Sequence, residues 1–442
     1  MGNEHGEENT FGIRERIDEG AVSIRQLFIV GICFAINFAD GFDVIAMSVT
    51  APIVSRQMGI QPSELGAVFS AALFGMAIGS LVLAPLSDKV GRRSIILHSV
   101  FAISLSMLLT AFAGALWQLV SLRFLTGIGI GAVLASATSI TSEFIPERRR
   151  SLAIILVATG FTVGTVVVGP LAGYLISNRG WQSVFLVGAS IGFVTLLTAL
   201  FLLPESIEYT ASTARGTENR LVLVNAALAK IKLPPLEILP GLEDIDRHSN
   251  GGICALLNGK YVRDTLLVWA LFFSVYWAVY FLLNWVPQLF SIAGFELGQS
   301  IVALTTLTFG GLLGAWFIGA VTSWLNLNSI VSAMLLAAAL LMSVYYFVRP
   351  EAAYTNYVFM FCVGFTLNGG LTALYAVVSQ IYPIAYRATG IGWAIGIGRF
   401  GAIFSPLLAG YVIGADVNMY DSILLLGVPA AVFGVIAIRL LK

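Results

Sequence analysis

The sequence predicts an all-α membrane protein with twelve transmembrane helices in two six-helix bundles and with both termini cytoplasmic. Of its 442 residues, 58% are hydrophobic and only 11% are charged, whereas a soluble domain carries about 25% charged residues. Apolar segments of membrane-spanning length recur twelve times, six on each side of one long polar stretch. Basic residues concentrate in the connections that one side of the membrane would hold. These three observations predict the architecture.

A helix needs about 20 mostly apolar residues to cross the hydrocarbon core of a bilayer. In chain order, and called helix 1 to helix 12 below, the segments that meet this requirement are 26–54, 63–86, 94–114, 117–141, 151–176, 181–203, 263–291, 297–322, 327–348, 354–380, 386–413 and 420–440. The chain therefore divides into a cytoplasmic N-terminal segment 1–25, a first bundle 26–203, a cytoplasmic linker 204–262 and a second bundle 263–442.

The distribution of Lys and Arg predicts the orientation, because cytoplasmic loops carry an excess of both. With cytoplasmic termini, Arg56, Arg179 and Arg349 lie outside, and Arg123 and Arg399 lie within apolar segments. The remaining basic residues, of 24 in total, then lie in the cytoplasm. The first twenty residues are polar and lack the apolar region of a cleavable signal peptide. A multi-pass protein of a cell membrane, typically a bacterial inner membrane, is expected.

The two halves are related by an internal repeat. Residues 142–176 align without gaps on 379–413. The identical pairs are Ser142 and Ser379, Pro146 and Pro383, Arg150 and Arg387, Gly164 and Gly401, Ala172 and Ala409, Gly173 and Gly410, Tyr174 and Tyr411, and Ile176 and Ile413. Parallel repeats of six helices are typical of secondary transporters whose substrate site lies near the midplane, between the halves. Arg399 aligns with Thr162, so symmetric packing does not require that charge.

Enzymatic and metal-dependent functions find no support in the sequence. Cys33, Cys254 and Cys362 lack metal-ligand spacing. No nucleophile elbow, metal cluster or phosphate-binding loop occurs, and the linker is too short for a signalling domain. Neither a metal, a cofactor nor a nucleic-acid partner is expected, and a monomer in the lipid bilayer is the simplest assembly.

Helix 1 carries two aspartates within its apolar segment. Asp40 and Asp43 lie three residues apart and share one helix face, with Gly41 between them. Two neighbouring carboxylates in a medium of low dielectric constant resist joint ionisation, so one of them is expected to carry a proton. Charged groups at this depth are costly and indicate function. The alternative is structural: one Asp pairs with a buried Arg or hydrogen-bonds Asn37.

Two arginines also lie within the apolar segments. Arg399 is near the middle of helix 11, where a buried guanidinium needs a partner. That partner is either Asp40 or Asp43, or a substrate carboxylate with the Asp as its resting partner. Arg123 begins the glycine-rich part of helix 4. It either extends toward the outer surface, pairs with a nearby residue, or takes part in proton coupling.

Polar and aromatic side chains on helices 7, 8 and 10 are candidates for the wall of a substrate cavity. Tyr280, Asn284 and Gln288 repeat at four-residue intervals on one face of helix 7, and polar groups on an apolar helix point inward. The other candidates are Tyr276, Trp277, Thr308, Asn368 and Tyr375.

The connection between helices 2 and 3 contains the run Asp88-Lys89-Val90-Gly91-Arg92-Arg93. Gly91 permits a tight turn, and the charged side chains are expected to meet Glu143 at the cytoplasmic end of helix 4. This run closely resembles the loop 2–3 signature of the major facilitator superfamily. The usual leading glycine is Ala84 here.

Narrower motifs resemble the aromatic acid:proton symporter family of that superfamily. They are Asp40-Gly41-Phe42-Asp43, Asn284-Trp285-Val286-Pro287, and the series Tyr382, Pro383, Arg387, Gly390, Gly392, Trp393, Gly398, Arg399 and Gly401. The resemblance implies import of a benzoate-like acid with a proton. It also implies that Asp40, Asp43, Arg123, Glu143 and Arg399 matter for transport. Relatives often carry an acid in loop 8–9; Ser323 stands in that loop here, so no role transfers to it.

Together these patterns predict a transporter that imports an aromatic carboxylate with protons by alternating access. The substrate carboxylate would meet Arg399, and protonation of Asp40 or Asp43 would neutralise the loaded carrier. A cluster of Asp88, Gly91, Arg92, Arg93 and Glu143 would latch the cytoplasmic side. The alternatives are a proton-coupled importer of another organic anion or of a sugar, and a proton-antiport exporter. The Gly169-Pro170 pair of helix 5 resembles a motif common in exporters of the superfamily.

Overall fold

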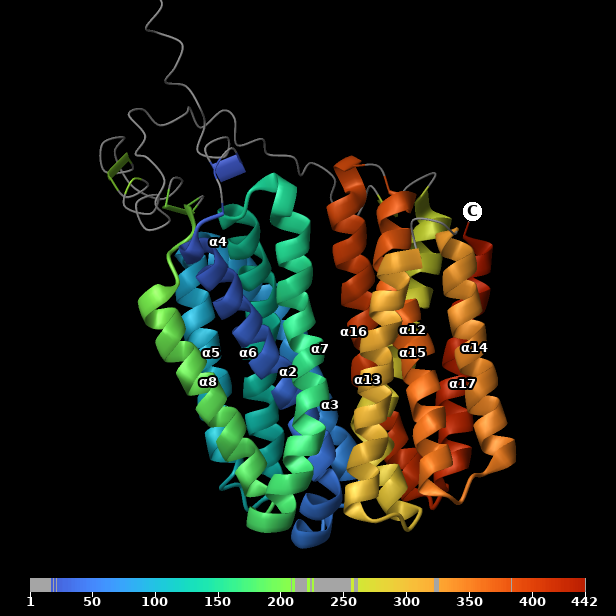
Figure 1. The fold of residues 1–442 in the computed structure, drawn as a ribbon. Helices are drawn as coiled ribbons and strands as arrows, with labels where there is room; N and C mark the ends of the chain where they lie inside the picture. The colour runs from blue at the N-terminus through green and yellow to red at the C-terminus, as the bar shows by residue number, and fades with distance from the viewer. Residues whose placement is uncertain are drawn as a thin grey trace, which may run out of the picture.

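The computed structural model describes most of the chain and is entirely helical over that part (Figure 1). The described residues are 17–18, 20, 22–207, 209–210, 221–222, 225, 256–257, 261–321, 326–382 and 384–441, with the backbone alone at 88, 379 and 384–388. Within them, 12 helices are long and apolar enough to cross a membrane, which confirms the number predicted from the sequence.

The first group of helices contains six of these spans. It comprises α2 (Ile24–Met58), α3 (Pro62–Ile78) with the π-helical turn η1 (Gly79–Leu83), α4 (Ala84–Val90), α5 (Arg92–Thr110), α6 (Leu116–Phe144), α7 (Glu147–Arg179) and α8 (Gln182–Leu202). The second group comprises α12 (Val262–Ile292), α13 (Leu297–Val321), α14 (Leu327–Val348), α15 (Ala353–Ile381), α16 (Ile384–Gly414) and α17 (Met419–Leu440).

Several helices extend beyond the apolar segments that predict them. The side chain of Ser23 caps α2, and the helix continues past residue 54 to Met58, where Gly59 adopts a left-handed conformation. Its interior Pro52 does not end it. The polar final turns of α2, α6 and α7 are helical although they are not apolar, because hydrogen bonding within the helix continues after the hydrophobic stretch ends.

Glycines allow the helices of the first group to pack closely. A Cβ atom at Gly127 of α6 would lie 2.0 Å from the carbonyl oxygen of Ala72 on α3, and one at Gly41 of α2 would lie 2.0 Å from that of Phe161 on α7. Gly41 therefore serves the contact between α2 and α7. The Gly127 region of α6 is a helix-packing surface, as its position within an apolar helix indicates.

The two groups lie side by side and contact each other at one end. In Figure 1, α2 to α8 lie on the left and α12 to α17 on the right, and the groups diverge toward the upper end, where α7 and α16 begin. We call the opposite end, where α2 ends at Met58 and α12 at Ile292, the lower end. Near it, a Cβ atom at Gly66 of α3 would lie 2.7 Å from the carbonyl oxygen of Pro406 on α16.

Candidate functional site

A buried ion pair joins α2 to α6 within the membrane-spanning region. Nη1 of Arg123 donates to Oδ1 of Asp43 at 2.9 Å and to Oδ2 at 3.0 Å. Arg123 is 2% exposed and Asp43 1% exposed. Nη2 of Arg123 lies 3.4 Å from the hydroxyl of Thr110, and its guanidinium carbon lies 5.4 Å from the ring centre of Phe185. Arg123 thus points into the protein, and the alternative of an outward-extended side chain is wrong.

Asp40 is buried in a different environment from Asp43. It is 2% exposed, and it makes no hydrogen bond or ion pair with any residue that the structure describes. The neighbouring Asn37 donates from its amide to the carbonyl oxygen of Cys33 and not to Asp40. An ionised carboxylate without a partner at this depth is strongly disfavoured. Of the two aspartates, Asp40 is therefore the one suited to hold a proton.

Arg399 lies across the molecule on α16, beside a group of tyrosines. It is half-buried and makes no ion pair or hydrogen bond within the described part of the chain. Its charge interacts electrostatically with the hydroxyls of Tyr276 and Tyr280 on α12 and of Tyr375 on α15. The expected partners of Arg399 are Asp40 or Asp43. Neither pairs with it in the described part of the chain, and Asp43 pairs with Arg123 instead. A guanidinium without an acidic partner among the described residues has donors that suit a carboxylate.

Ring contacts hold the three tyrosines together. The hydroxyls of Tyr276 and Tyr375 lie 2.8 Å apart, which links α12 to α15. The ring of Tyr276 stacks on those of Phe272 and Tyr280, with ring centres 6.1 Å and 5.8 Å apart. A Cβ atom at Gly398 would lie 3.1 Å from the Tyr276 ring, so the residue before Arg399 permits this close approach. The cluster thus offers both aromatic faces and hydroxyl groups.

Asn284 and Gln288 lie where the two groups of helices meet. Asn284 lines a small cavity together with Asp43, Met47, Phe69 and Arg123, although its amide nitrogen donates to the carbonyl oxygen of Tyr280. Gln288 accepts a hydrogen bond from Ser55 on the opposite group of helices. The structure therefore brings Asn284 near the ion pair and leaves Gln288 at the lower end.

Three further candidates are engaged in helix packing. The indole N–H of Trp277 donates to the carbonyl oxygen of Leu426 on α17, at 3.1 Å. Thr308 donates to Thr305 within α13, and Asn368 packs against Gly311 of the same helix. The structure does not bring Trp277 into the tyrosine cluster.

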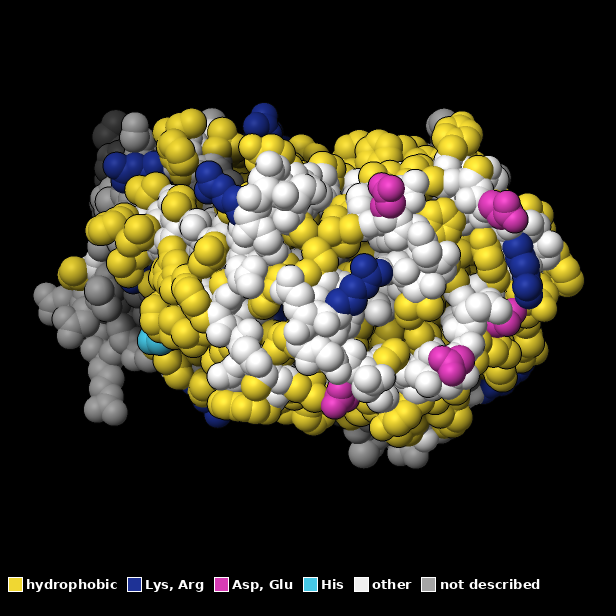
Figure 2. Space-filling view, turned by 90° about the horizontal axis from the view of Figure 1, so that it is seen from below, with side chains coloured by type: hydrophobic (Ala, Val, Ile, Leu, Met, Phe, Trp, Pro, Cys, Tyr) yellow, Lys and Arg dark blue, Asp and Glu magenta, His cyan; other side chains and the backbone are white. Residues whose placement is uncertain are grey.

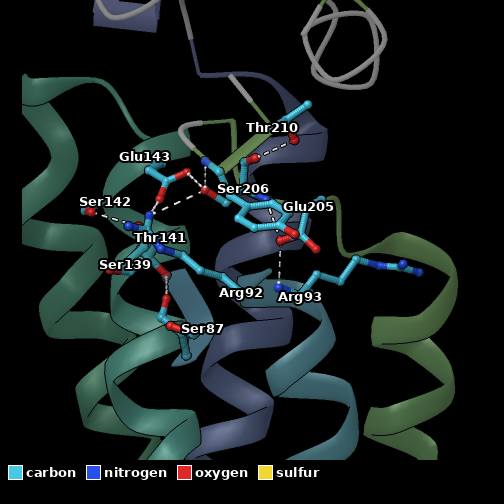
Figure 3. Close-up of polar contacts among 12 residues, drawn as sticks. Ser87, Arg92, Arg93, Ser139, Thr141, Ser142, Glu143, Glu205, Ser206 and Thr210 are labelled. Carbon is cyan, nitrogen blue, oxygen red and sulfur yellow. Dashed lines mark hydrogen bonds and ion pairs between the residues drawn. The ribbon is translucent and has the colours of Figure 1, made fainter. Parts of the chain in front are cut away.

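The predicted latch residues gather at the upper end (Figure 3). Arg92 of α5 forms an ion pair with Glu143 of α6, and Gly91 has a φ angle of 108°, which favours glycine. The backbone N–H of Arg93 donates to Glu205 at 2.9 Å, and its Nη2 donates to the carbonyl oxygen of Leu200. The side chain of Asp88, also predicted here, and residue 323 lie outside the described part.

Sequence analysis missed two members of this upper cluster. The hydroxyl of Ser206 donates to Oε2 of Glu143 at 2.7 Å, and Glu205 receives the N–H of Arg93 (Figure 3). Both residues follow α8, in the part of the chain assigned to the linker. A Pro-Glu-Ser run directly after a membrane span was the available signal, since Pro204 ends the helix and places polar groups at its terminus.

Comparison with known proteins identifies the family of this chain. Residues 33–374 match the family model described as Major Facilitator Superfamily. The 4-hydroxybenzoate transporter PcaK of Acinetobacter baylyi is 33% identical over 94% of this chain and 91% of its own length. The gallate transporter of Pseudomonas putida is 32% identical over 95% and 92%. The crystal structure of a D-xylose-proton symporter has a TM-score of 0.69 at 16% identity, over 92% of this chain and 97% of that one.

The chain therefore belongs to the Major Facilitator Superfamily, and it is a multi-pass membrane protein of the transporter class, not an enzyme. Within that superfamily its relatives are aromatic-acid transporters, as the motifs around Asp40 and Arg399 predict. The described residues contain no group of His, Cys, Asp and Glu that could hold a metal ion.

Proposed function

We propose that this protein is a secondary active transporter that imports an aromatic carboxylate together with protons, by alternating access between bundles 26–203 and 263–442. The observation that carries the proposal is the separation of charges in the membrane. Asp43 and Arg123 neutralise each other, and among the described residues the buried Asp40 has no cation as a partner and Arg399 has no anion. Such a site is completed by one carboxylate and one proton.

The substrate carboxylate binds the guanidinium of Arg399, which has free donors in a planar fork. The aromatic ring of the substrate packs against Tyr276 and its neighbours. The hydroxyls of Tyr276 and Tyr375 form hydrogen bonds with substituents on that ring. The relatives named for 4-hydroxybenzoate and gallate support this class of ligand, because both compounds combine a carboxylate with ring hydroxyls.

The proton binds at Asp40. A carrier with an unpaired carboxylate and an unpaired guanidinium within the membrane carries two isolated charges, each of which is costly to desolvate. Loading Asp40 with a proton and Arg399 with the substrate anion removes both. The loaded carrier then reorients at a lower free-energy cost than a half-loaded one. This difference couples the flux of the substrate to the flux of protons.

The bias of Lys and Arg assigns the upper end and both termini to the cytoplasm, and a bacterial inner membrane is the membrane in which such carriers act. The lower end is then the outer end. Because the two groups of helices contact each other there, this conformer faces the cytoplasm. The described ion pair between Arg92 and Glu143 joins α5 to α6 within the first group of helices, and we expect this cluster to latch the upper end when it closes. The transporter acts as a monomer.

Uptake into proteoliposomes tests the proposal. Labelled 4-hydroxybenzoate, benzoate, a dicarboxylate and a sugar are each supplied with and without an inward proton gradient. Accumulation of the aromatic monocarboxylates only with the gradient is expected. Gradient-driven uptake of only the sugar or the dicarboxylate would replace the substrate class. Gradient-driven expulsion of the aromatic acid would make the protein an exporter.

A further inference from the structure

An arginine at the lower end bridges the two groups of helices without meeting an acid. Nη2 of Arg56, near the end of α2, donates to the hydroxyl of Ser291 on α12 at 2.6 Å. Arg56 is exposed, and it makes no ion pair with any residue in the described ranges. A serine hydroxyl satisfies one donor of the guanidinium but leaves its charge uncompensated.

The contacts around Arg56 close the junction of α2 with α12. The hydroxyl of Ser55 donates to Oε1 of Gln288 at 3.5 Å. One helix further, the ring of Phe69 on α3 meets that of Trp285 edge-on, with ring centres 5.5 Å apart. We call this set of contacts the outer seam. Its polar contacts are neutral apart from Arg56, so they separate at lower cost than buried ion pairs.

Polar side chains lead from the outer seam to the buried ion pair. Asn284, Gln288 and Ser291 are spaced by four and three residues, so they form a stripe along one face of α12. Its inner end, Asn284, shares a cavity with Asp43 and Arg123. Arg56 lies 13 positions beyond Asp43 on α2, or about 20 Å at 1.5 Å per residue. The stripe thus joins a cation at the surface to the charged residues in the membrane.

We propose that Arg56 is an outer receiving site for the substrate carboxylate. Once the substrate has passed inward, the guanidinium of Arg56 donates to Ser291 and the site closes. This inference rests on the proposed function, because it assumes an anionic substrate that arrives from the lower end. In the conformer open to that end, separation of α2 from α12 removes Ser291 from the guanidinium. Arg56 then presents free donors to an incoming carboxylate, which then moves along the polar stripe.

Electrostatic attraction favours this role for an arginine at the lower end. Figure 2 shows that face with Lys and Arg side chains over both halves and with Asp and Glu side chains mostly over the right half. A cation beside a passage raises the local concentration of anions and their rate of arrival, in a manner that salt screens. Arg349, another arginine with a described contact at this end, is paired with Asp421 at 3.1 Å. No acid in the described part of the chain forms such an ion pair with Arg56.

Initial uptake of labelled 4-hydroxybenzoate into right-side-out membrane vesicles, at low and high ionic strength, tests the proposal. Arg56→Gln is expected to lower kcat/KM about tenfold at low salt and to remove most of its salt dependence, with kcat largely retained. Arg56→Lys keeps the charge and is expected to keep the salt dependence. Arg179→Gln removes a charge from an exposed arginine at the end of α7 that makes no described hydrogen bond or ion pair with the outer seam, and it serves as the matched control.

Ser291→Ala separates the receiving role from a purely structural one. It removes the seam contact but leaves the cation, so kcat/KM is expected to stay within about twofold of the unsubstituted protein. Equal losses of kcat/KM in Arg56→Gln and Ser291→Ala, with the salt dependence intact in both, would overturn the proposal. Arg56 would then have a purely structural role in the outer seam. A salt response in Arg179→Gln as weak as in Arg56→Gln would also overturn it. Failure of the proposed function is distinguishable, because the unsubstituted protein would then take up no aromatic acid.

Discussion

The guanidinium of Arg123 contacts both carboxylate oxygens of Asp43 through a single nitrogen, at 2.9 and 3.0 Å, in a site where neither side chain is more than 2% exposed. The pair joins α2 to α6 within the same group of helices. Because each ion compensates the other, the pair is electrically neutral as a unit. In the proposed function the pair therefore remains intact through the transport cycle, while Asp40 and Arg399 are proposed to carry the charges that change.

Removing one member of this pair is expected to destabilise the fold more than removing both. Asp43→Asn or Arg123→Gln leaves an uncompensated buried ion, at a cost of about 3–5 kcal/mol. The double variant leaves two neutral amide groups and should regain a large part of the lost stability. Thermal unfolding in detergent measures the difference. Equal melting temperatures for the double variant and the worse single variant would show that the pair is not the source of the stability.

Asp40→Asn is expected to uncouple transport without unfolding the protein. Asp40 has no described ion pair to lose, and Asn matches the shape of a protonated carboxyl group. Exchange of labelled for unlabelled substrate should persist, while accumulation driven by an inward proton gradient should vanish. Uptake by the unsubstituted protein should rise as the outside pH falls, and that of Asp40→Asn should not. Asp416→Asn, which removes an exposed acid at the lower end, is the control, and it should accumulate substrate normally.

The number of spans and the family were predictable from sequence because both depend on patterns that the bilayer imposes. A span needs a long apolar run, and twelve such runs lead to twelve helices. The ends of the helices were less predictable. Gly59 and Ser23 set the limits of α2, and neither belongs to the apolar segment. The helix bounds follow from capping and hydrogen bonding, which hydrophobicity does not report.

The residues of the site were predictable but their pairing was not. Asp43, Arg123 and Arg399 stand out in sequence because charge is rare in apolar helices. Which acid meets which base depends on how α2, α6 and α16 are arranged in space, and one conformer of the cycle shows Asp43 with Arg123. Trp277 illustrates the same limit, because the spacing on α12 does not reveal that its indole N–H donates to a carbonyl oxygen on α17.

Gly91→Ala is expected to disrupt the upper cluster. The φ angle of 108° is unfavourable for a residue with a Cβ atom, and that atom would lie 2.7 Å from Oε2 of Glu205. Strain of this kind costs about 1–3 kcal/mol. The melting temperature should therefore fall. Gly114→Ala, where a Cβ atom meets nothing within 4 Å, should leave it nearly unchanged. A similar melting temperature for both variants would argue against a fixed turn at Gly91.

Tyr276→Phe is expected to weaken substrate binding selectively. It removes the hydroxyl that contacts Tyr375 but keeps the ring that stacks on Phe272 and Tyr280. One hydrogen bond contributes about 0.5–1.5 kcal/mol, so the Kd should rise by about two- to tenfold. The loss should be larger for 4-hydroxybenzoate than for benzoate if the hydroxyl meets a ring substituent. Calorimetric titration of both ligands gives the comparison, and an equal loss would assign the hydroxyl to the carboxylate instead.

Arg399→Gln is expected to abolish binding of the aromatic acid while leaving the fold as stable as before. Arg399 has no described ion partner, so its removal creates no orphaned acid in the protein. A bound carboxylate would lose its counterion, which costs about 2 kcal/mol or more and raises the Kd by at least about 30-fold. Arg399→Lys should recover little, because an ammonium group lacks the planar fork. Arg349→Gln, which removes a surface arginine paired with Asp421, controls for the change in net charge and should bind normally. Unaltered affinity in Arg399→Gln would move the carboxylate site elsewhere, and a large fall in melting temperature would mean that Arg399 has a partner inside the protein.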